Sequence, residues 1–275
     1  MDTTRPVKHM MGAVVGDIVG SVYEFRNIHT EDFPLFKPLS RVTDDSVMTC
    51  AVAQALLNAK RRDTSVYEEL VENMQAFGRH FPEASYGRRF IDWIWTSDPE
   101  PYDSWGNGAP MRCSPAGWIT DDVRKAEALG EATAEPTHSH PYAKNAAGTV
   151  AGLICLALGK PDKEELLWYI EQRHYRVPTM TWLKKYNTFD DSSQGTMPAA
   201  LACFIHGDSF EDCIRKAISI GGDSDTIAAI TGSIAEAYYG IPDDILNQAW
   251  RYVPDELRIV LHNFHNTFIA QGAEH

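Results

Sequence analysis

The 275-residue sequence predicts a compact all-α fold, because helical periodicity dominates the chain and strand signals are weak. Apolar residues recur at helical spacing, whereas no run of β-branched residues alternates cleanly for more than a few positions. Hydrophobic residues make up 44% and charged residues 23%, as in ordinary globular proteins with a sizeable core. We see no linker, low-complexity tract or fixed-period repeat, so we expect one domain over residues 1–275.

Six segments show the helical pattern most clearly. The first follows Thr43, a good N-cap residue, and the third is rich in small residues, which predicts a closely packed central helix. Gly221 ends the fourth segment, and Gly240 with Pro242 closes the fifth. In chain order, the predicted helices are 44–60, 65–78, 145–158, 209–220, 225–239 and 254–271.

Three further stretches are predicted without a full helical pattern. Residues 192–196 precede another helix, which has Pro198 in its first turn. The proline-containing segments 28–41 and 96–115 are predicted loops, and loops of this length in a compact domain are often functional.

A glycine repeat near the start of the chain predicts close helix packing. Gly12, Gly16 and Gly20 follow one another at four-residue spacing, which lets one helix approach another closely. Asp17 stands between them as either a buried hydrogen-bonding residue or a ligand, and we favour the first role.

Charge and cysteine content narrow the functional classes. The formal net charge is −13, and no basic surface suited to nucleic acid is apparent. The five cysteines form no C-x-x-C pair and suggest neither a disulfide framework nor a zinc site. No signal peptide is apparent, and the most apolar stretch, 146–158, is too short to span a bilayer. We therefore expect a cytoplasmic protein, a monomer by default, with neither nucleic acid nor a membrane as its partner.

Two acidic clusters are the strongest chemical signal. Residues 43–45 read Thr-Asp-Asp, and residues 223–226 read Asp-Ser-Asp-Thr after two glycines. Each cluster stands before a helix, so each alone is explained by capping and by the helix dipole. A cap needs only one oxygen, however, and each cluster supplies at least three. Hard divalent cations prefer such ligands, so the two clusters together favour a two-metal site.

Other polar residues leave alternatives open. Glu24 follows the glycine repeat and is either a surface glutamate or, beside a metal site, a group that takes a proton from water. The turn at 105–112 is either an ordinary Asn-Gly turn or a backbone cradle for a phosphate. His138 and His140 could ligate a transition metal, but we favour a hydrogen bond to substrate or a capping role.

The set of motifs, in this order, resembles the ADP-ribosylglycohydrolase family, which includes the dinitrogenase-reductase-activating glycohydrolases and the ADP-ribosylhydrolases. The similarity covers the chain from about Met11 to Pro242. It rests on segments 16–24, 43–46, 106–112, 137–140, 194–195 and 221–226. The resemblance implies an all-α orthogonal helical bundle with a central metal-binding cleft. It also implies a centre of two Mg²⁺ or Mn²⁺ ions and cleavage of the glycosidic bond that joins ADP-ribose to an acceptor.

The resemblance also implies roles for individual residues. The metal ligands are Thr43, Asp44, Asp45, Asp223, Asp225 and Thr226, with Asp44 and Asp225 also counted as catalytic. Glu24, the third catalytic residue, matches a glutamate that lies near the scissile bond in the branch directed at serine and poly(ADP-ribose). The implied substrate contacts are Ser104, Trp105, Gly106, Asn107, Gly108, Met111, His138, Gly222 and Ser224, with tryptophan in place of the family's usual tyrosine at position 105.

The leading interpretation is therefore a metal-dependent hydrolase that releases ADP-ribose from a protein or a small ADP-ribosylated substrate. The alternatives are an ADP-ribose-binding module without turnover, a metal-dependent phosphohydrolase that acts on a nucleotide diphosphate, and a purely structural helical protein. The bond to the acceptor could be an N-linkage to arginine or an O-linkage to serine, and the context of Glu24 slightly favours an O-linked substrate. Tyr142 and Phe189 are both candidates for stacking on adenine.

Overall fold

The computed structural model describes residues 3–270, and its helices confirm the predicted all-α class. Within that range no strand occurs, and an isolated bridge pairs Gly106 with Ser192. The elements are α1 (Met11–Gly20), α2 (Asp44–Arg62), α3 (Val66–His80), α4 (Arg88–Trp95), α5 (Ser114–Trp118), α6 (Val123–Ala134), α7 (Pro141–Leu158), α8 (Lys163–Gln172), α9 (Met180–Tyr186), α10 (Ser193–Ile205), α11 (Phe210–Ser219), α12 (Ser224–Tyr239), α13 (Asp243–Trp250), α14 (Asp255–Phe264) and the π-helix η1 (His265–Ile269).

All six predicted helices are present, as α2, α3, α7, α11, α12 and α14. Helix α7 begins four residues earlier than predicted, because Pro141 fits the first helical position and His140 accepts the Tyr142 N–H. The last predicted helix changes at His265 into the π-helix. Its predicted end, Gln271, lies outside the described residues.

Two local predictions need correction. Pro198 is the sixth residue of α10 rather than part of its first turn, although Ser192 does cap this helix by accepting the Gly195 N–H at 3.1 Å. The predicted loop 96–115 ends at Cys113, because Pro115 sits in the first turn of α5, where its missing N–H costs nothing. The loop predicted at 28–41 contains no helix.

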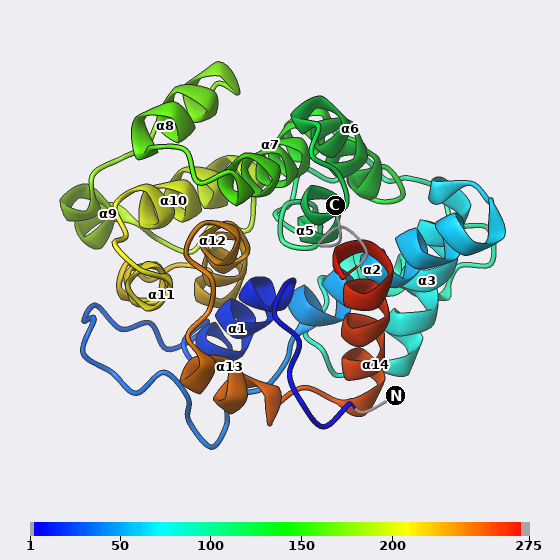
Figure 1. Ribbon diagram of the computed structural model, residues 1–275, viewed down its shortest axis with the longest axis horizontal. Coiled ribbons are helices and arrows are strands. Elements are labelled where there is room, and N and C mark those ends of the chain that lie inside the picture. The colour runs from blue at the N-terminus through cyan, green and yellow to red at the C-terminus, as the bar shows by residue number, and fades with distance from the viewer. Residues whose placement is uncertain (1–2, 271–275) are drawn as a thin grey trace.

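Helix α1 lies directly against α12 in the middle of the molecule (Figure 1). All ten residues of α1 are buried. A Cβ added to Gly16 would lie 2.1 Å from the Ala228 carbonyl oxygen, and one added to Gly20 would lie 2.3 Å from Asp225 Cα. Only glycine permits this backbone contact. The contact brings the end of α1 against the start of α12, where the second acidic cluster lies.

A side chain of α12 caps the N-terminus of helix α1. Its own N-cap residue, Met10, makes no side-chain capping bond. Instead the Glu236 carboxylate accepts the N–H groups of His9, Met11 and Gly12 at 3.0, 3.3 and 2.7 Å. Burial raises the pKa of Glu236 to about 7, although these bonds oppose the shift. The two helices are therefore joined at both ends, by glycine packing at one and by this carboxylate at the other.

The core is a continuous cluster of buried apolar side chains that runs from Val7 to Phe264. All five cysteines are buried and free, which agrees with the absence of a predicted disulfide framework. Among residues 3–270, no helix combines the length and the apolar character needed to cross a membrane.

Candidate active site

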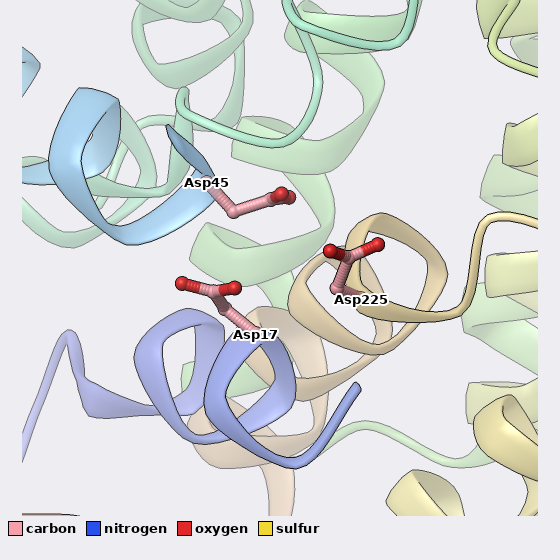
Figure 2. A group of neighbouring side chains, drawn as sticks. All are labelled: Asp17, Asp45 and Asp225. Carbon is pink, nitrogen blue, oxygen red and sulfur yellow. The ribbon is translucent and has the colours of Figure 1, made fainter. Parts of the chain in front are cut away.

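The fold brings the two acidic clusters together. Asp17 of α1, Asp45 of α2 and Asp225 of α12 each place a carboxylate oxygen within 4.8 Å of the others, and the three side chains extend into one space between their helices (Figure 2). Thr226 joins the clusters directly, because its hydroxyl donates to Asp45 Oδ2 at 3.2 Å across 181 residues of sequence. Glu24, Asp223 and Asp225 form a second group with the same spacing.

Asp17 organises the start of α2. The Thr43 N–H and hydroxyl donate to its two carboxylate oxygens at 2.8 and 2.6 Å, and both the N–H and the hydroxyl of Ser46 donate to Oδ2. Asp17 is completely buried, as the sequence predicts for a hydrogen-bonding residue. Its position beside Asp45 and Asp225 also makes it part of the acidic group.

Capping does not explain the clusters. Thr43 and Asp223 occupy N-cap positions, yet neither side chain makes a capping bond, so the predicted capping role of the Thr43 side chain is wrong. The Thr43 hydroxyl is directed to Asp17 instead. Asp45 Oδ1 is buried and has no hydrogen-bond partner within the described chain. A buried carboxylate oxygen without a partner is costly, and a hard cation would satisfy it.

The electrostatics of the cluster favour a bound cation. Burial, and then the charge of Asp17, raise the pKa of both Asp44 and Asp45 well above the usual range. Burial, followed by the charges of Asp45 and Asp223, does the same for Asp225. Burial and the charge of Asp223 raise the pKa of half-buried Glu24 to about 7. The carboxylates repel one another, and a divalent cation among them would remove that repulsion.

A cavity of about 410 Å³ opens over the acidic group. Its lining includes partly exposed Asp44 together with Tyr102 and His138. Twelve of the residues implied by the resemblance line it: Glu24, Asp44, Asp45, Ser104, Gly106, Asn107, Gly108, Met111, His138, Asp223, Asp225 and Thr226. Phe189, a candidate for stacking on adenine, lines it as well, whereas Tyr142 does not.

Four predicted site residues do not line this cavity. Thr43 lies behind it on Asp17, and Trp105 is 57% exposed and packs edge-on against His140. Gly222 and Ser224 are held by Asn27, whose amide donates to the Gly222 carbonyl at 2.9 Å and to Ser224 Oγ at 3.2 Å. The φ of +85° at Gly222 suits glycine and shapes the entry to α12.

Asn107 has a supporting role that the sequence did not indicate. Its amide donates to Asp223 Oδ2 at 2.7 Å and to Thr196 Oγ1 at 3.0 Å, and its N–H donates to the Asp191 carbonyl. Two of its donors therefore fix an acidic residue and a neighbouring helix. Asn27 was missed altogether, since an asparagine in a turn carries no signal for a partner 195 residues away.

His138 is held in place on the lining of the cavity. The Arg112 guanidinium donates to Thr137 Oγ1 at 2.8 Å, and that oxygen is hydrogen-bonded to His138 Nδ1 at 2.7 Å. A Cβ added to Gly108 would lie 2.9 Å from His138 Nε2, so glycine leaves room for the ring. Burial and the charges of Arg112 and Arg89 lower the pKa of His138 well below 6.5, so the ring is neutral at physiological pH.

The chain is similar to known proteins along most of its length. Residues 3–271 match the family model described as ADP-ribosylglycohydrolase. The chain is 26% identical to ADP-ribosyl-[dinitrogen reductase] glycohydrolase of Rhodospirillum rubrum, over 87% of both chains. It is 25% identical to ADP-ribosylarginine hydrolase Tri1 of Pseudomonas putida, over 88% of this chain and 73% of the relative.

Two further comparisons extend along nearly the whole chain. Identity to human ADP-ribosylhydrolase ARH3 is 24%, over 94% of this chain and 92% of the relative. A solved structure described as an ADP-ribosylglycohydrolase-related protein complex superposes with a TM-score of 0.68 at 25% identity, over 94% of this chain and 96% of the other. Since the family model spans almost every residue and the fold agrees, the chain belongs to the ADP-ribosylglycohydrolase family, a family of enzymes.

Proposed function

We propose that this enzyme hydrolyses the glycosidic bond between ADP-ribose and an acceptor at a centre of two divalent cations, Mg²⁺ or Mn²⁺. The proposed ligands are Thr43, Asp44, Asp45, Asp223, Asp225 and Thr226. The observation that carries the proposal is the unpartnered Asp45 Oδ1 among carboxylates that raise one another's pKa. Oxygen donors of this kind suit hard divalent cations and no soft metal.

When bound, such cations would orient the ribose hydroxyls and increase the acidity of a bound water. The chain's own residues set the geometry. Asp17 fixes the N-terminus of α2, which carries Asp44 and Asp45, and Asn107 fixes Asp223. Both acidic clusters are therefore positioned by hydrogen bonds from other parts of the chain. We infer that Asp44 and Asp225 contribute to catalysis by placing the ribose.

Glu24 is the proposed general base or substrate-orienting carboxylate. It lines the acidic end of the cavity beside Asp223 and Asp225, and it is only half-buried, so water can reach it. A pKa of about 7 would allow a carboxylate to accept a proton and return it near neutral pH. This role differs from that of Asp17, whose four hydrogen bonds leave it no comparable freedom.

The remaining cavity residues are proposed to hold the ADP part of the substrate. Ser104, Gly106, Asn107, Gly108 and Met111 line the cavity, and neutral His138 adds a hydrogen-bonding ring. Trp105 is proposed to contact the substrate from the exposed rim. Gly222 and Ser224 are left out of this proposal because Asn27 occupies their polar atoms.

The cellular setting is a further part of the proposal. We propose a single domain over residues 1–275 that acts as a monomer in the cytoplasm on ADP-ribosylated protein or a small ADP-ribosylated substrate. Five buried free thiols fit a reducing compartment. The net charge of −13 disfavours a nucleic-acid partner.

The test is ADP-ribose release from ADP-ribosylated protein in the presence of Mg²⁺. Asp225→Ala is expected to lower kcat/KM at least a hundredfold, because it removes a group shared by both acidic sets; Glu24→Gln should lower kcat more than it changes KM. Asp98→Ala, at an exposed acid outside the cavity, is the matched control.

The products separate the alternatives. Release of intact ADP-ribose supports glycosidic cleavage, whereas release of AMP would favour a phosphohydrolase, and tight binding without product would favour a binding module. Full activity of Asp225→Ala would overturn the proposed metal centre, and full activity of Glu24→Gln would remove the role of that carboxylate.

A further inference from the structure

Four arginines around the cavity make no ion pair within residues 3–270. Arg88, Arg89 and Arg112 line the cavity, and Arg41 borders it. The hydrogen-bond partners of three of these guanidinium groups are neutral: Arg41 donates to Ser85 Oγ and the Glu83 carbonyl, Arg89 to the Tyr102 carbonyl, and Arg112 to the Thr133 carbonyl and Thr137 Oγ1. Of the other eleven arginines, seven make no ion pair within residues 3–270, and four pair with carboxylates: Arg62, Arg173, Arg215 and Arg258.

What distinguishes these four is that they gather around one cavity, in a chain whose acidic residues outnumber its basic ones, 38 to 25. A carboxylate partner would be easy to supply, so leaving four guanidinium groups without one at a single cavity points to an anion that comes from outside the chain. Charge left unpaired on a binding surface is the complement of the charge on the partner.

The four cations form two groups by position. Arg89 and buried Arg112 both lie close enough to His138 to lower its pKa. This inner pair suits the diphosphate within the ADP part of the substrate, which the proposed function assigns to the residues around His138.

Arg41 and Arg88 form an outer pair, because both are exposed and Arg88 follows Ser85, the residue that Arg41 binds, by three positions. The Arg41 guanidinium holds Ser85, which lines the cavity together with Glu24 and Asp44, and its charge acts on Glu24 by lowering that pKa against the larger effect of burial. The Asp44 N–H donates to the Ala84 carbonyl at 2.7 Å, which fixes this segment beside the acidic group. Arg41 and Arg88 are both exposed, so they face whatever the ribose is attached to.

We propose that Arg41 and Arg88 recognise anionic side chains of the acceptor, so that the preferred substrate carries Asp or Glu next to the ADP-ribosylated residue. This inference rests on the proposed function, and it names the class of acceptor. The 410 Å³ cavity leaves no room for a polypeptide, so the acceptor chain crosses its mouth, where these two cations stand.

The experiment compares kcat/KM for peptides that carry one ADP-ribosylated residue between acidic, neutral or basic flanks, with serine and with arginine as the modified residue. At low salt, acidic flanks are expected to give about fivefold higher kcat/KM than basic flanks, the size that exposed ion pairs support. The preference should shrink in 0.5 M salt, because ions screen exposed charges. Arg88→Glu should reverse it in favour of basic flanks.

Arg61→Glu is the matched control, since it makes the same charge change on an exposed residue at the opposite end of α2. It should leave the order of the peptides unchanged, and a melting temperature for each variant confirms folding. Equal kcat/KM for acidic and basic flanks, or an unchanged order in Arg88→Glu, overturns the inference. Release of ADP-ribose from none of the peptides would instead count against the proposed function.

Discussion

At the residue scale, the acidic centre shows how neighbours assign different roles to the same side chain. Asp17 receives four hydrogen bonds and is tied to the start of α2, whereas Asp45 keeps one buried oxygen without a partner. Both are aspartates with almost no exposure. The difference lies only in which hydrogen-bond donors reach them, and it separates a positioning carboxylate from a proposed ligand.

His138 gives a pH dependence at this scale. Burial and the charges of Arg112 and Arg89 lower its pKa well below 6.5, so the folded protein keeps the ring neutral while the unfolded chain takes up a proton below that pH. The stability that this provides is complete above pH 6.5 and is lost as the pH falls below it. When the pH is lowered from 6.5 to 5.5, the free energy of unfolding in urea should therefore fall less for His138→Asn than for the wild type. The difference between the two decreases should be up to about 1 kcal/mol. His206→Asn, at an exposed histidine, should follow the wild type; equal slopes for His138→Asn would contradict the assignment.

Residue types predicted most of the cavity, but not the partners of its residues. The acids at 44–45 and 223–225 are conspicuous because two caps do not need so many oxygens. Nothing local marks Asn27 or Thr196, whose partners lie 195 and 89 residues away. Arg112 stands inside a recognised motif, yet its link through Thr137 to His138 appears only in the folded chain.

At the scale of elements, the longest helices were predictable and the shortest were not, although the 12-residue α6 was missed while the 10-residue α11 and α14 were predicted. Helices α2, α3 and α12 carry enough turns for a period to emerge, whereas α9 has seven residues and α5 only five. Such short elements owe their helical state to tertiary packing rather than to their own pattern. Glycine spacing predicted close packing of α1 but could not name α12 as its partner.

The contact between α1 and α12 yields a stability prediction. Gly16→Ala would push a methyl group to 2.1 Å from the Ala228 carbonyl oxygen, so the helices must separate, at a cost of about 3 kcal/mol in the free energy of unfolding. Gly87→Ala is the control, because a Cβ there meets nothing within 4 Å. Chemical denaturation measures the free energy of unfolding of both variants. Similar values would mean that α1 and α12 can separate at little cost, against the prediction.

At the scale of the whole molecule, the acidic centre lowers the stability of the fold in which it forms. Three helices converge on it, and the chain already carries a net charge of −13. Repulsion among buried carboxylates lowers the stability of the cation-free protein, and the unfolded chain offers no such site. Whole-molecule stability and cation binding are therefore linked.

We expect Mg²⁺ or Mn²⁺ to raise the melting temperature of the whole protein, because a ligand that binds only the folded state stabilises it by mass action. At a hundred times the dissociation constant, the gain is about 2.7 kcal/mol. Differential scanning calorimetry with and without the cation measures it, and Asp45→Asn should abolish most of the gain. A melting temperature that saturating cation leaves unchanged would refute the proposed centre.

The burial of α1 has a consequence for the newly made chain. Its partner helix begins about 200 residues later, so at ordinary rates of synthesis α1 leaves the ribosome about 10 to 40 seconds before α12 does. During that delay, the apolar surface of α1 that α12 covers in the folded protein stays exposed. The nascent protein must keep its first helix from aggregating until the last fifth of translation.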